Sequence, residues 1–187
     1  MWSSRDISLV IITAVVAFVF QALIFGLPKT ITGIPFSNSV TSIWGALTVS
    51  LAFLLFEGRR WRFSVHNILY VFLTFPTPFV GPPFDVPPRL VSILAGIIAD
   101  LLLNLIYQKS KNSNKLLWWS ILVSVFFFNL IPILNLPVMP FFLTQSAIDM
   151  IVNGIIVTTP FRIIGQIAGG YLAYQVYTRV GGYKQSN

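Results

Sequence analysis

The sequence predicts an all-α membrane protein with about six transmembrane helices and both termini in the cytoplasm. Hydrophobic residues make up 56% of the 187 residues, charged residues only 9%, and the mean hydropathy is +0.82. An average soluble chain has about 25% charged residues, and the deficit here extends along the whole length. These values exclude a soluble domain, a disordered chain and a fibrous protein.

Apolar runs long enough to cross a bilayer define the expected helices, because a hydrocarbon core of about 30 Å needs about 20 apolar residues. The expected spans are residues 7–27, 37–56, 63–80, 90–107, 116–136 and 161–180. The first run ends at Pro28 and the second at Glu57. The third contains His66, Pro76 and Pro78, so its second half is expected to kink or to leave the membrane.

The C-terminal region needs a separate interpretation. Residues 147–180 are too long for one upright span, and Pro160 divides them. We expect a final helix over residues 161–180, preceded by a re-entrant or extracellular helical segment over residues 147–157. One long tilted helix is the alternative.

The distribution of basic residues predicts the orientation. The segments expected in the cytoplasm hold Arg5, Arg59, Arg60, Arg62, Lys109, Lys111, Lys115, Arg179 and Lys184. The opposite loops hold only Lys29 and Arg89. This bias follows the positive-inside rule, and it explains the net charge of +7 by loops that face anionic lipid rather than by nucleic acid.

Residues that could support catalysis are scarce, so no enzyme, metal site or cofactor is expected. The chain has no Cys, no GxSxG or HExxH motif and no glycine-rich phosphate loop. Its single histidine, His66, has no acidic residue three or four positions later. We interpret His66 as an anchor at the membrane interface.

Asp100 and Arg162 are the main ionisable residues within the expected spans. A charged side chain at the bilayer centre costs roughly 2.5 to 3.5 kcal/mol on insertion scales, so each should face protein. Asp100 is interpreted as a buried hydrogen-bonding group that fixes helix packing. Arg162, near the outer end of the last span, is interpreted as a functional residue.

Polar residues crowd toward the predicted outer face and form the candidate substrate site. They offer hydrogen-bonding groups, and nearby phenylalanines can supply stacking walls. The candidates are Asn38, Arg89, Asn129, Asn135, Gln145, Asp149, Asn153 and Arg162. Asp149 and Asn153 are four residues apart and share one helix face. The alternative is that these residues are polar because they contact water.

Small residues at four-residue spacing predict faces where helices approach closely. Gly165, Gly169 and Ala173 form such a face in the last helix, and Thr13 with Ala17 form one in the first. Packing within the chain is one explanation. A docking surface for a second membrane subunit is the other explanation for the first helix.

Over most of its length the chain resembles the substrate-binding S components of energy-coupling factor (ECF) transporters. The resemblance rests on size, on six expected spans with both ends inside, and on a long first outer loop from residue 28 to residue 38. It also rests on Pro87, Pro88 and Arg89, followed by a run that reaches Asp100 and ends in leucines, and on the Gly165 to Ala173 helix.

The resemblance implies capture of a water-soluble vitamin or precursor at the cell membrane, driven by a transmembrane coupling subunit and two ATP-binding cassette subunits. In that family an AxxxA pair docks on the coupling subunit; Thr13, Ala14 and Ala17 occupy that place here. The family's ligand site matches the candidate cluster above. A self-sufficient homo-oligomeric transporter or channel, and a structural subunit of a membrane complex, are the rival hypotheses.

Overall fold

The computed structural model describes residues 2–26, 38–77 and 84–185, which form helices and short connections without any β-strand in these ranges. The elements are α1 (Ser4–Gln21), a π-helix η1 (Ala22–Gly26), α3 (Asn38–Phe56), α4 (Arg62–Thr74), α5 (Val86–Asn112), α6 (Leu116–Asn135), a short 3-10 helix η3 (Met139–Phe141) and α7 (Gln145–Gln185). The all-α prediction is therefore confirmed for the described part of the chain.

Within the described ranges, four segments are long and apolar enough to cross a membrane. They are Ser4–Ile24, Val86–Asn112, Leu116–Phe141 and Gln145–Val180. Ser42–Phe56 is apolar but shorter, and α4 has only 13 residues and ends at Thr74, earlier than expected for the third span. Residues 78–80 of that span lie outside the described residues. The lengths support a membrane protein, whereas six spans and cytoplasmic termini stay predictions.

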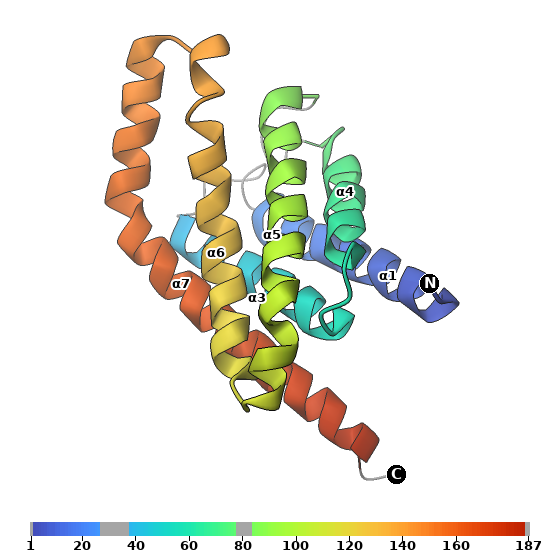
Figure 1. Cartoon of the computed structure of the whole chain (residues 1–187). Coiled ribbons are helices and arrows are strands. Elements are labelled where there is room, and N and C mark those ends of the chain that lie inside the picture. Colours follow the sequence, from blue (N-terminus) through green and yellow to red (C-terminus); the bar gives the residue numbers. More distant parts are fainter. Residues whose placement is uncertain (1, 27–37, 78–83, 186–187) are drawn as a thin grey trace.

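The C-terminal region is one continuous helix, which corrects the expected separate segment over residues 147–157. Helix α7 runs for 41 residues through Pro160, as the long-helix alternative stated. Thr158 and Thr159 donate side-chain hydrogen bonds to the carbonyl oxygens of Gly154 and Ile155, at 2.8 and 2.6 Å. Back-bonding of this kind together with an internal proline bends a helix without ending it, and α7 changes direction in its upper part (Figure 1).

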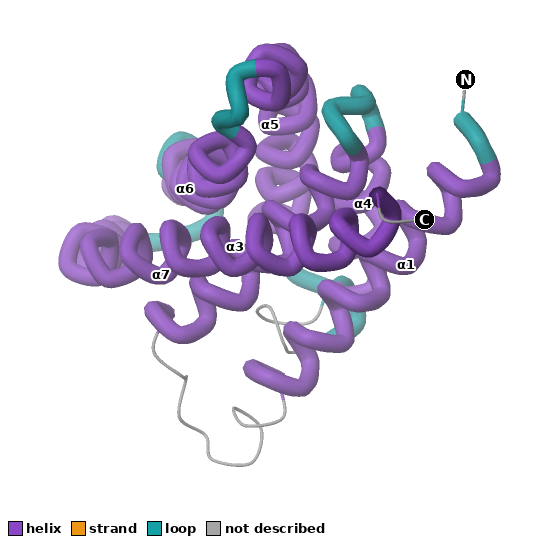
Figure 2. The backbone as a smooth tube through the Cα atoms, turned by 90° about the horizontal axis from the view of Figure 1, so that it is seen from below, coloured by secondary structure: helices purple, strands orange, loops and turns teal. Residues whose placement is uncertain are grey.

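The helices pack in two layers. Figure 1 shows α4, α5 and α6 upright, with α1, α3 and the second part of α7 crossing behind them at a slant. Figure 2, turned by 90°, shows α5 and α6 nearly end-on beside the slanted α7 and α1. The core lies where the layers meet: Phe53 stacks on Phe63 at 4.0 Å between ring centroids and meets Trp119 edge-on at 5.9 Å.

Glycines set the distance between α7 and its neighbours. A Cβ atom at Gly169 would meet the carbonyl oxygen of Ile43 and lie 2.6 Å from the Cβ of Ala46, both on α3. At Gly170 it would lie 2.8 Å from the Cα of Ile121 on α6. The small-residue face of the last helix therefore packs within the chain, as the first explanation stated.

Ion pairs tie the start of α1 to the turn between α3 and α4. Ser3 and Asp6 form a capping box at the start of α1. The same Asp6 carboxylate accepts hydrogen bonds from Arg59 at 2.6 Å and from Arg62 at 3.0 Å. The Arg62 guanidinium also lies over the ring of Trp2, 4.3 Å from its centroid. One buried carboxylate thus joins two segments that are far apart in the sequence.

Replacing Asp6 with alanine should lower the free energy of unfolding by about 1 to 3 kcal/mol, because Arg62 loses its carboxylate partner and the Ser3 backbone N–H loses its acceptor in the capping box. The melting temperature of the purified protein in detergent measures this change. Glu57→Ala is the matched control: its contact with Arg59, at 3.5 Å, is exposed, and exposed pairs contribute about 0 to 1 kcal/mol. Equal decreases in the melting temperatures of the two variants would contradict a stabilising role of the buried Asp6 contacts.

Candidate binding cavity

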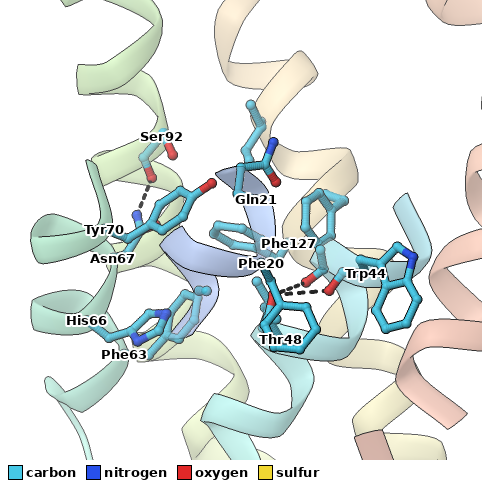
Figure 3. A pocket seen from close by; sticks show the side chains of 15 residues that line it. Phe20, Gln21, Trp44, Thr48, Phe63, His66, Asn67, Tyr70, Ser92 and Phe127 are labelled. Carbon is cyan, nitrogen blue, oxygen red and sulfur yellow. Dashed lines mark hydrogen bonds between the residues drawn. The ribbon is translucent and has the colours of Figure 1, made fainter. Parts of the chain in front are cut away.

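A pocket of about 190 Å³ lies among α1, α3, α4, α5 and α6 (Figure 3). Its apolar wall consists mainly of aromatic rings from α1, α3, α4 and α6. These are Phe20, Trp44, Phe63, Phe127 and Phe128. A dry cavity of about 150 Å³ is large enough to bind benzene, so this pocket has room for a molecule with one ring and a small substituent.

The polar lining is neutral. It comprises Gln21, Thr48, His66, Asn67, Tyr70 and Ser92, and no Lys, Arg, Asp or Glu occurs among the described residues that line the pocket. The Thr48 hydroxyl bonds to carbonyl oxygens of its own helix, at 3.0 and 3.1 Å. In Figure 3 the Tyr70 hydroxyl points toward the space beside the Gln21 amide. Pockets with apolar walls and a few convergent polar groups are the usual form of small-molecule sites.

His66 is part of the interior, which corrects its interpretation as an anchor at the interface. Only 3% of its surface is exposed. Its Nδ1 atom lies 2.9 Å from the Thr13 hydroxyl on α1, and its ring stacks on Phe63 at 5.4 Å. The ring is buried because α1 and α4 pack against each other at this position.

Asn67 links α4 to α5 beneath the pocket. Its side-chain amide donates to the carbonyl oxygen of Ser92 at 2.7 Å. The close approach depends on Gly96, where a Cβ atom would lie 2.9 Å from the Asn67 amide carbon. The bond occupies an amide N–H of Asn67 and leaves its carbonyl oxygen available as a second hydrogen-bonding group on this wall.

Arg89 is the predicted site residue nearest in sequence to the polar wall, one turn before Ser92. It is buried, donates to the Thr74 hydroxyl at 3.0 Å, and lies over the Phe75 ring at 5.6 Å. These contacts direct its charge toward the end of α4. Arg89 is not among the residues that line the pocket.

Asn129 and Arg162 join α6 to α7 instead of lining a shared ligand site. The Asn129 amide donates to the Gln166 side-chain oxygen at 2.8 Å. The Arg162 guanidinium donates to the carbonyl oxygen of Phe128 at 3.2 Å. Phe128 faces the pocket, so both residues act behind its wall. The structure gives Arg162 a contact between helices, and its predicted functional role stays a prediction.

The remaining members of the predicted outer cluster do not converge. Asn135 donates to the carbonyl oxygen of Ile131 in its own helix at 3.0 Å. The Gln145 side chain donates to Asp149 at 2.9 Å on an exposed face, and Asn153 is also exposed. The side chain of Asn38 lies outside the described residues. The structure therefore does not bring these residues together into one cavity.

The face of α1 that was predicted to dock on a partner is buried within the chain. Ala14 is completely buried, Ala17 is 9% exposed and lines the pocket, and Thr13 contacts His66. Small residues let α1 approach its own neighbours here. This corrects the docking assignment, because the face is not open to another subunit.

Asp100 has the packing role expected of it. It is completely buried and accepts hydrogen bonds from the Ser64 backbone N–H and hydroxyl, both at 2.8 Å, and from the Asn104 amide. These bonds attach the start of α4 to the middle of α5. They lie away from the pocket, whose lining does not include Asp100.

Most residues that line the pocket were not predicted as site residues, although the spacing of polar residues in α4 could have indicated some of them. His66 and Asn67 precede Tyr70 by four and three residues, so the three side chains lie toward one face of α4. Pro76 and Pro78 in the same span instead indicated that its second half kinks or leaves the membrane.

In comparisons with protein-family models, curated proteins and solved structures, nothing matches this chain.

Proposed function

We propose that this chain is the substrate-capture subunit of an ATP-driven uptake transporter for a small organic micronutrient, similar to the S components of ECF transporters. The supporting observation is the pocket, with its aromatic wall and neutral polar wall inside a bundle of apolar helices. In this proposal the pocket replaces the outer polar cluster as the ligand site.

The proposed location is the cell membrane, with six passes and both termini in the cytoplasm. The turns between α3 and α4 and between α5 and α6, and the C-terminal end of α7, lie toward the same side in Figure 1. Exposed basic residues occupy these segments: Arg59, Arg60, Lys109, Lys111, Lys115 and Arg179. Their common side supports the proposed orientation, because basic residues concentrate on the cytoplasmic side.

In the proposed mechanism this chain binds the solute, while a transmembrane coupling subunit and two ATP-binding cassette subunits supply the energy. The coupling subunit must then dock on a surface other than the Ala14 and Ala17 face, since that face packs within the chain. Uptake that persists without ATP-binding cassette subunits would favour a self-sufficient transporter instead.

The experiment that tests capture is mass spectrometry of the gently purified protein, read for both subunit mass and co-purified small molecules. We expect a monomer with a bound solute. Thr48→Phe should lose the solute, because the added ring fills the pocket, whereas Asp149→Ala should keep it, because Asp149 is exposed away from the pocket. An empty homo-oligomer would point to a channel, and an empty monomer to a structural subunit; either result would overturn the proposal.

A further inference from the structure

We infer that the pocket selects a neutral, planar ligand with a single ring and one small substituent that both donates and accepts hydrogen bonds, such as a carboxamide. This inference rests on the proposed capture function and specifies its substrate class. Four properties of the pocket lead to it: its charge, its size, its wall shape and the placement of its polar groups.

The lining selects against an ionised ligand. None of the described lining residues is Lys, Arg, Asp or Glu. A charge moved from water into such a site without a counter-charge costs several kcal/mol. The nearby Arg89 guanidinium is directed to the Thr74 hydroxyl and the Phe75 ring. A carboxylate would therefore find no side chain of opposite charge among the described residues that line the pocket.

The size and the aromatic wall favour one flat ring. The pocket, at about 190 Å³, is somewhat larger than an enclosed cavity of about 150 Å³ that binds benzene, which leaves room for a small substituent. Phe127 meets Phe63 edge-on, with ring centroids 5.3 Å apart. Phe20 and Trp44 lie 6.0 Å apart at a tilt of 32°. Rings arranged in this way offer both faces and edges to a π-system.

Apart from Thr48, whose hydroxyl is bonded to carbonyl oxygens of its own helix, the polar groups lie toward one side of the pocket. In Figure 3, His66, Asn67, Tyr70 and Ser92, from α4 and α5, stand opposite Trp44 and Phe127, with the Gln21 amide between them. A ligand should therefore place its substituent toward α4 and its bare ring edge toward α3 and α6.

The hydrogen-bonding character of that side can be worked out at His66. The Thr13 hydroxyl lies 2.8 Å from the Leu9 carbonyl oxygen and donates to it. Its oxygen then accepts from His66 Nδ1–H at 2.9 Å. A neutral imidazole protonated at Nδ1 leaves Nε2 as an acceptor. On the same side of the pocket, the Tyr70 hydroxyl points toward the Gln21 amide and can donate (Figure 3), so this side offers both an acceptor and a donor.

The test uses small probes and equilibrium dialysis against the full chain in lipid nanodiscs, after dialysis has removed any co-purified solute. The probes are benzamide, its anionic counterpart benzoate, the two-ring 2-naphthamide, and toluene, which has no polar substituent. Specific binding is the amount of probe bound to the wild-type protein minus the amount bound to Thr48→Phe, in which the pocket is filled. This difference removes the contribution of probe that partitions into lipid.

We expect benzamide to bind, and benzoate and 2-naphthamide to bind at least about 100-fold more weakly. The unpaired charge of benzoate and the second ring of 2-naphthamide should each weaken binding by a few kcal/mol, which corresponds to this ratio of dissociation constants. Tyr70→Phe should weaken benzamide binding about fivefold to tenfold, as expected for one lost hydrogen bond, and leave toluene binding unchanged. Tyr171→Phe is the matched control, since Tyr171 is exposed on α7.

The outcomes separate the ligand class from the capture function. Benzoate binding as tightly as benzamide, or equal loss of benzamide and toluene in Tyr70→Phe, would overturn the ligand class. A co-purified solute that is charged or has two rings would do the same while leaving capture intact. Absence of any solute together with absence of probe binding would overturn both.

Discussion

A valine at Gly169 should prevent α7 from packing on α3, and the protein should lose its folded, monodisperse state in detergent. Even the first carbon of a side chain at this position would meet the backbone oxygen of Ile43 and the Cβ of Ala46. Backbone atoms cannot move aside as a flexible side chain can. Overpacking of this kind costs about 1 to 3 kcal/mol or more, so we expect Gly169→Ala to be destabilised and Gly169→Val to be lost.

Helix α7 itself supplies the control for this prediction. Gly154 lies in the same helix, but a Cβ atom there would meet nothing within 4 Å. Gly154→Ala should therefore keep or raise stability, by up to about 1 kcal/mol from helix propensity. Heating followed by size-exclusion chromatography with tryptophan fluorescence detection measures both variants. Equal melting temperatures for Gly169→Ala and Gly154→Ala would contradict the close contact between α3 and α7.

Composition and spacing predicted the helical class, and they predicted α3 and α6 to within one residue of their observed ends. They also predicted the small-residue face of α7, because an interface between close helices leaves a direct trace in the sequence. Bending at Pro160 was harder to predict. The sequence shows the proline, but whether the helix ends or bends there depends on back-bonding and on neighbours.

The pocket could not be predicted from polarity alone, for a physical reason. A polar side chain in an apolar helix can satisfy itself locally: Asn129 and Asn135 donate to the carbonyl oxygens of Val125 and Ile131, four residues earlier. Such residues resemble site residues in the sequence. The pocket instead uses residues from five helices, and only tertiary packing brings Gln21 on α1 near Tyr70 on α4.

The polar group with the largest expected effect on stability is Asp100. Replacing it with leucine should lower the free energy of unfolding by about 3 kcal/mol or more, because the Ser64 N–H, the Ser64 hydroxyl and the Asn104 amide all lose their buried acceptor. One orphaned buried donor costs about 1 to 3 kcal/mol. Asp100→Asn keeps one carbonyl oxygen and should lose less. Melting temperatures in detergent rank the two variants.

A double-mutant cycle with Ser64→Ala tests whether the loss arises from this contact. The two changes should be less than additive, because Ser64→Ala removes one of the donors that Asp100→Leu leaves unsatisfied. Binding of the co-purified solute per folded molecule should stay unchanged in Asp100→Asn, since Asp100 does not line the pocket. If this variant kept its melting temperature but lost the solute, Asp100 would belong to the function of the protein instead of to its packing.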